Sequence, residues 1–204
     1  MLATLTACAL GFVSGLRHAL EPDHVTAVTT FVAGQKSVRA SIRYAVAWGC
    51  GHAVMLLLAA GALALLRREL PPRVGDILEL FVAASLVALG ARGLFLATKP
   101  AKQTAPSSGL PFIVGLVHGL AGSGALAALV ASHVPSALFA VAFIAIYAVG
   151  AAVGMATLAG TMGWPLARVT RNARAMTVVI GGAAVASLAL GIVWAAPIVM
   201  RLAS

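Results

Sequence analysis

Long uninterrupted apolar stretches make up most of the chain, and this feature most restricts its possible folds. Each stretch is long enough to cross about 30 Å of hydrocarbon as a helix, and none alternates polar with apolar residues as a membrane β-barrel does. The stretches cover residues 3 to 33, 42 to 66, 77 to 98, 110 to 131, 136 to 163 and 176 to 200. We therefore predict an all-α integral membrane protein with six transmembrane helices.

The charged residues lie mainly between these stretches and predict the orientation in the membrane. The formal net charge is +9, which in a soluble chain would suggest a nucleic-acid partner. Here, however, loops one, three and five and the adjoining ends of the stretches hold Lys36, Arg39, Arg43, Arg92, Lys99, Lys102, Arg168, Arg171 and Arg174, whereas the other side holds Arg67, Arg68, Arg73 and Arg201. The positive-inside rule puts the first set in the cytoplasm and both termini outside. The excess of Arg over Lys and the richness in Ala and Gly indicate a GC-rich prokaryote. The expected localisation is the prokaryotic cytoplasmic (inner) membrane, and no nucleic-acid partner is expected.

The second half of the chain repeats the first at an offset of about one hundred residues. Gly15 and His18 stand against Gly115 and His118 at an offset of 100, and similar matches follow in the next two stretches. Because each copy holds three helices, an odd number, the second copy would enter the membrane from the opposite side, as in inverted-topology transporters. The predicted units are a first three-helix repeat over 1–98, a polar linker over 99–109 and a second three-helix repeat over 110–204.

The first stretch carries five ionisable residues within eight positions, namely Arg17, His18, Glu21, Asp23 and His24. A charge at the bilayer centre costs about 2.5 to 3.5 kcal/mol, so this group needs a compensating reason. Arg17 and Glu21 stand at i and i+4, and we expect them to form a structural ion pair. His18, Asp23 and His24 are donors suited to a transition metal.

Pro22 predicts how these three donors converge. On a straight helix His18 and His24 would point about 120° apart. Pro22 removes the backbone hydrogen bond to the His18 carbonyl and disfavours helical geometry at Glu21. We predict that the first helix breaks near Pro22, which lets the donors turn toward one point beside freed carbonyls that favour a cation.

Two further histidines are candidates for the same site. His118 takes the place of His18 in the second repeat, within the Gly-rich sequence HGLAGSGAL, where close helix packing and local unwinding are both open. His52 lies near the middle of the second stretch, flanked by Gly51. Cys8 and Cys50 also lie in apolar stretches, where a small apolar residue is their commonest interpretation.

Three motifs together resemble a known family. The segment His18-Ala19-Leu20-Glu21-Pro22-Asp23-His24 reads H-x4-D-H and, with Leu16-Arg17 before it, resembles the signature helix of the nickel/cobalt transporter (NiCoT/NicO) family and its short six-span UreH-like members. Gly51-His52 resembles the family's second histidine motif, and HGLAGS resembles a stretch of the short members. The resemblance implies transport of Ni(II) or Co(II), with His18, Asp23, His24 and His52 as the metal-binding set. The chain departs from high-affinity members at Thr29-Thr30, where those commonly have Asp-Asn.

The leading hypothesis is a secondary transporter and not an enzyme, which moves a divalent transition metal across the cytoplasmic membrane. The expected metal residues are His18, Asp23, His24, His52 and His118, supported by Arg17 and Glu21. The metal is substrate, no cofactor is expected, and the partners are the ion, the bilayer and, as an open question, further copies of the chain. No GxxxxGK[ST] motif is present, so an ion gradient, the membrane potential or a partner would supply energy. Three alternatives remain: a membrane thiol–disulfide carrier using Cys8 and Cys50, a small-anion exporter using Arg17, and an assembly scaffold that transports nothing.

Overall fold

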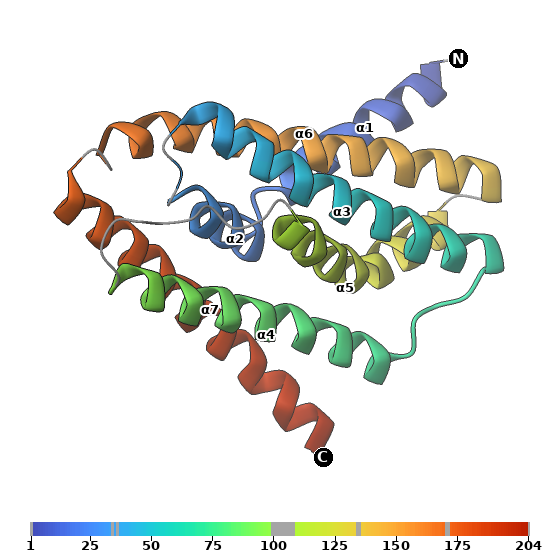
Figure 1. Ribbon diagram of the computed structural model, residues 1–204. Coiled ribbons are helices and arrows are strands. Elements are labelled where there is room, and N and C mark those ends of the chain that lie inside the picture. Colours follow the sequence, from blue (N-terminus) through green and yellow to red (C-terminus); the bar gives the residue numbers. More distant parts are fainter. Residues whose placement is uncertain are drawn as a thin grey trace.

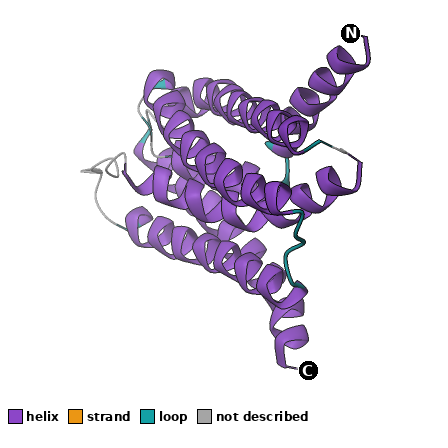
Figure 2. Ribbon diagram, turned by 90° about the vertical axis from the view of Figure 1, so that its right-hand side faces the viewer, coloured by secondary structure: helices purple, strands orange, loops and turns teal. Residues whose placement is uncertain are grey.

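In the described part of the chain, every regular element is a helix (Figure 1). The structure is a computed structural model that describes residues 2–33, 35, 37–98, 109–133, 136–169 and 172–203. Its helices are α1 (Leu2–His18), α2 (Pro22–Val32), α3 (Val38–Leu66), α4 (Pro72–Ala97), α5 (Gly109–His133), α6 (Ala137–Val169) and α7 (Ala173–Ala203). Figure 2 shows the same helices turned by 90°. The predicted all-α class is confirmed for these residues.

Four of the described helices are long and apolar enough to cross a membrane. They are α3, α4, α6 over Ala137–Leu166 and α7 over Arg174–Ala203. In α5 the described apolar stretch is shorter, Gly109–Ala121, and the first predicted span is divided between α1 and α2. Large apolar side chains such as Leu138 (77% exposed) and Val178 (73% exposed) cover outer faces, as suits contact with lipid tails. The chain is thus a multi-pass membrane protein, and the number of six spans stays a prediction.

The predicted break near Pro22 is present between α1 and α2. Residues 19–21 form a turn that joins the two helices. Pro22 takes the first position of α2, where its missing N–H costs no helical hydrogen bond, and Glu21 before it is extended at φ −64° and ψ 146°. The His18 carbonyl accepts a hydrogen bond from the Glu21 N–H at 3.0 Å instead of continuing the helix. The end of one helix and the start of the next therefore face the same space.

α3 packs against both α5 and α6, and α1 packs along α6 (Figure 1). The approach of α3 to α5 is close enough to require glycine. A Cβ at Gly115 would run into the Trp48 carbonyl oxygen, and a Cβ at Gly119 would run into the His52 carbonyl oxygen. Since only glycine lacks this atom, these two positions let α5 bring His118 next to the face of α3 that carries His52.

α4 and α7 form a second closely packed pair, and they run in opposite directions in Figure 1. The buried Ser187 hydroxyl of α7 donates a hydrogen bond to the Leu86 carbonyl of α4 at 2.7 Å. At one end of the pair, Arg201 Nε donates to Asp76 Oδ1 at 3.2 Å. α2 contacts α3, α4, α6 and α7, so the half-helix after the break lies inside the bundle.

The predicted division into 1–98, 99–109 and 110–204 stays a prediction. Residues 99–108 of the predicted linker lie outside the described residues, and α5 begins at Gly109. The most extensive helix pairs join the two predicted repeats: α1 with α6, α3 with α5 and α6, and α4 with α7. The first and second halves of the chain therefore share most of their helix contacts.

Candidate metal site

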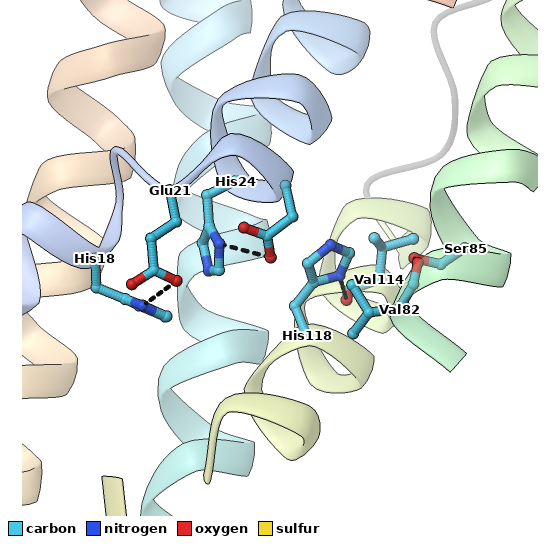
Figure 3. A network of polar contacts seen from close by, with 8 residues as sticks. His18, Glu21, His24, Val82, Ser85, Val114 and His118 are labelled. Carbon is cyan, nitrogen blue, oxygen red and sulfur yellow. Dashed lines mark hydrogen bonds and ion pairs between the residues drawn. The ribbon is translucent and has the colours of Figure 1, made fainter. Parts of the chain in front are cut away.

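The helix break brings the predicted metal residues close together, and Figure 3 shows three of them, His18, His24 and His118. His18 is the last residue of α1, Asp23 and His24 lie in the first turn of α2, His52 comes from α3 and His118 from α5. We call these five residues, His18, Asp23, His24, His52 and His118, the His/Asp cluster. All five are buried, from 0% exposed for His52 to 8% for His18. Each predicted metal residue thus lies in the cluster.

The four imidazole rings of the cluster lie close together. The ring centroid of His18 is 4.3 Å from that of His24 and 5.2 Å from that of His52. The His24 centroid is 5.1 Å from that of His52 and 5.7 Å from that of His118. Ligand atoms of His18, His24 and His52 lie within 4.8 Å of one another. Because nitrogen ligands at about 2.1 Å from a metal lie within about 4 Å of each other, small side-chain movements would close these three around an ion.

Three of the histidines place Nδ1 against an oxygen and leave Nε2 without a protein partner among the described residues (Figure 3). His18 Nδ1 is 3.0 Å from Glu21 Oε2, and His24 Nδ1 is 2.9 Å from Asp23 Oδ2. His118 Nδ1 is 3.0 Å from the Val114 carbonyl oxygen. For His18 and His118, a proton on Nδ1 leaves a lone pair on Nε2, and an oxygen behind a histidine prepares it to bind metal in this way. His24 Nδ1 has only the short ion-pair distance to Asp23 Oδ2, without the geometry of a hydrogen bond.

Buried polar atoms without a partner are concentrated in the cluster. Among the described residues they include His18 Nε2, Asp23 Oδ1, His24 Nε2, both ring nitrogens of His52 and His118 Nε2. Leaving such an atom unsatisfied costs about 1–3 kcal/mol, and folded proteins pair the large majority of them. A single cation that accepts lone pairs from several of these atoms would remove this cost at once.

Comparison with known proteins gives one informative match. The chain is 31% identical over 187 residues to the urease accessory protein UreH of Bacillus sp. (strain TB-90), and the match covers 83% of this chain and 82% of that protein. The chain belongs to the UreH-like nickel/cobalt transporter family. No protein-family model matches the chain, and no solved structure matches it significantly. The resemblance of its H-x4-D-H segment to this family is therefore confirmed.

In this member of the UreH-like family, two aromatic residues that the sequence did not single out as site residues form walls of the cluster. The fully buried Trp48 ring lies 5.2 Å from that of His24 and 5.5 Å from that of His118. The Tyr147 ring lies 5.5 Å from that of His18. A sequence signal existed for Trp48, because it precedes His52 by one helical turn and so shares its face.

A cavity of about 330 Å³ opens beside the cluster. It is lined by His18, Glu21, Asp23, His24, Glu79, Val82, His118, Ala121, Leu126, Tyr147 and Trp194. The family motif therefore faces a space that can hold an ion with part of its water shell. Glu79 of α4 adds a carboxylate that the sequence interpretation did not include.

The expected ion pair between Arg17 and Glu21 is not formed among the described residues. The Glu21 carboxylate lies against His18 instead, and Arg17 is exposed. The i, i+4 relation requires one continuous helix, but α1 ends at His18, so the two side chains are no longer on one helical face. Glu21 therefore supports the cluster through His18 and not through Arg17.

The two cysteines contribute no ligand to the His/Asp cluster. Both Cys8 and Cys50 are free, and Cys50 is exposed on the outside of α3. Neither lines the cavity beside the cluster. Their placement agrees with the interpretation of small apolar residues in lipid-facing or partly buried positions.

Proposed function

We propose that this protein is a secondary transporter that carries Ni(II) or Co(II) across the cytoplasmic membrane of a prokaryote, with the His/Asp cluster as the binding site for the ion. The observation that carries the proposal is the convergence of four buried histidines whose Nε2 atoms have no protein partner among the described residues. Membership in the UreH-like nickel/cobalt transporter family supports the same class of cargo.

In this proposal, Nε2 of His18 and His24 and one ring nitrogen of His52 bind the ion first, because their ligand atoms are already close. The unpaired Asp23 Oδ1 and His118 Nε2 are available as further ligands. Imidazole and carboxylate suit nickel, cobalt and zinc, and affinity order alone does not choose among them. The histidines bind as neutral rings, so protons compete with the metal.

The proposal includes six spans, arranged as two inverted three-helix repeats, with both termini outside. One packing relation supports the repeat. A Cβ at Gly90 would meet Leu188 of α7, whereas a Cβ at Gly191 would meet Val87 of α4. Gly191 follows Gly90 by 101 residues, and Leu188 follows Val87 by 101 residues. The repeat offset therefore converts one contact into the other, as two symmetry-related copies would require. Rocking of one repeat against the other would expose the cluster to each side of the membrane in turn.

The test is metal flux into liposomes that contain the purified protein, with Ni(II), Co(II), Zn(II) and Mn(II) compared. We expect saturable flux of Ni(II) or Co(II) in the wild type and its loss in a variant with His18→Ala and His24→Ala. The matched control also carries two substitutions, Cys8→Ala and Cys50→Ala, which change one partly buried and one exposed side chain outside the cluster.

The same pair of variants separates this proposal from a thiol–disulfide carrier. A metal transporter keeps its flux without the cysteines and loses it without the histidines. The opposite pattern, or the absence of flux from a folded wild-type protein, would contradict the proposal.

A further inference from the structure

Two cavities adjoin at α4 and α7, which contribute residues to the lining of both. The first is the cavity of about 330 Å³ beside the His/Asp cluster. The second, of about 310 Å³, is lined by Glu79, Leu190, Val193, Trp194, Pro197, Ile198 and Arg201. Glu79 and Trp194 line both cavities. The two spaces thus meet at these residues and extend from the cluster toward Arg201 near the end of α7.

Glu79 is the ionisable side chain at this junction. It lies two turns into α4, in a helix apolar enough to span a membrane, and it is partly buried. The nearby Arg201 guanidinium pairs with Asp76 and also attracts the Glu79 carboxylate electrostatically. A carboxylate inside a spanning helix is costly, and residues of this kind commonly mark an ion pathway.

Within the described part of the chain, the cavity beside the His/Asp cluster contains buried polar atoms without a hydrogen-bond partner, which favour a cation there. Asp23 (6% exposed) and His118 (2% exposed) line the first cavity, and each has a buried polar atom without a partner among the described residues. Toward the C-terminal end of α2, apolar side chains occupy the space beside the helix. Val28, Phe31 and Val32 pack there in the apolar core with Trp48 and Leu86. The cavities therefore extend on the side of α4 where that helix begins.

We propose that Glu79 is a relay residue on the cation's route, which receives the divalent ion from the side where Asp76 and Arg201 pair and passes it to the His/Asp cluster. This inference rests on the proposed metal transport. It adds one residue, Glu79, and the side of the bundle from which the ion reaches the cluster. Asp76 contributes by neutralising Arg201, whose charge would otherwise repel a cation at the entrance. Glu79 acts on the rate of entry, whereas the cluster sets the affinity.

The first experiment separates these two roles with Glu79→Gln, which keeps the shape and removes the charge. The purified variant is titrated with Ni(II) by calorimetry and assayed for Ni(II) flux in liposomes. We expect the equilibrium affinity to stay within about twofold, while the initial flux at sub-saturating Ni(II) falls about tenfold, the low end of the effect of charge on association rates. The control is Glu69→Gln, which removes an exposed carboxylate outside both cavities.

A second experiment measures access without transport. In a chain with Cys8→Ala and Cys50→Ala, Glu79→Cys is treated with a charged, membrane-impermeant thiol reagent from each side. We expect labelling from the side where α4 begins. The control is Ala84→Cys on the same helix, an exposed position that lines neither cavity and faces lipid, and we expect it to stay unlabelled.

The outcomes distinguish this inference from the proposed function. Unchanged flux in Glu79→Gln, in a wild type that transports Ni(II), would overturn the relay alone, as would a cysteine at position 79 that the reagent does not reach from either side. If the wild type neither binds nor transports metal, the proposed function fails, and the relay fails with it. Labelling of position 79 in that case would show a water-filled route for a different cargo.

Discussion

The imidazole rings of His18 and His24 lie with their centroids 4.3 Å apart, although a continuous helix would point these side chains about 120° away from each other. The contact exists because α1 ends at His18 and α2 begins at Pro22. The turn between them redirects the chain, so a motif whose spacing does not fit one helical face still brings its histidines together. The cluster therefore depends on the break as much as on its ligands.

Removing one ring from this contact tests whether the cluster binds metal. We expect His24→Ala to weaken Co(II) binding by at least about 100-fold, because the loss of a direct ligand exceeds the effect usual for residues behind a ligand. Calorimetry measures the affinity, and the visible spectrum of bound Co(II) reports the ligand set. The control is Thr30→Ala on the same helix, whose hydroxyl bonds the Thr26 carbonyl. Equal affinity in His24→Ala and Thr30→Ala would show that the ion binds elsewhere.

The two carboxylate oxygens of Asp23 have different surroundings in the cluster. One substitution tests whether this carboxylate binds metal or only stabilises the fold. Asp23 Oδ2 lies 2.9 Å from His24 Nδ1, while Oδ1 has no partner among the described residues. Asp23→Asn keeps one acceptor oxygen and removes the charge, so we expect metal affinity to fall about 10- to 100-fold with little change in thermal stability. Calorimetry and a thermal melt in detergent measure the two effects. A large loss of stability with unchanged affinity would count against a role in metal binding.

The sequence predicts all five residues of the His/Asp cluster and misses other residues that helix packing brings beside it. The motif and Pro22 lie within eight residues, so the break and the convergence of His18 with His24 follow from backbone rules that act locally. The expected Arg17–Glu21 pair was wrong because it applied the spacing of an intact helix across that same break.

Glu79 and Tyr147 could not be placed from the sequence. Each lies on a helix remote in the chain from the motif, and only the packing of α4 and α6 around α2 brings them to the cavity. Trp48 is intermediate, since its spacing from His52 predicts a shared face but not the contact with His118.

Acidity should weaken metal binding by this site. The histidine ligands must be neutral to offer a lone pair, so binding releases any proton that they hold. We expect the apparent Kd for Ni(II) to rise as the pH falls from about 7.5 to about 5.5, the range in which histidines commonly gain a proton. Titration calorimetry in buffers of different ionisation enthalpy measures both the affinity and the protons released. Affinity that does not change over this range would exclude histidine nitrogens as the main ligands.

The close approach of α3 and α5 should be needed for both stability and metal affinity. A Cβ at Gly115 would run into the Trp48 carbonyl oxygen and lie 2.9 Å from the His52 backbone nitrogen, so Gly115→Ala must push the helices apart and move His52 away from His118. We expect a loss of about 1–3 kcal/mol, seen as a lower Tm in detergent, together with weaker Ni(II) binding. Gly181→Ala is the matched control, because no atom lies within 4 Å of its added Cβ. A Gly115→Ala protein that matches Gly181→Ala in both Tm and affinity would show that this contact does not hold the site together.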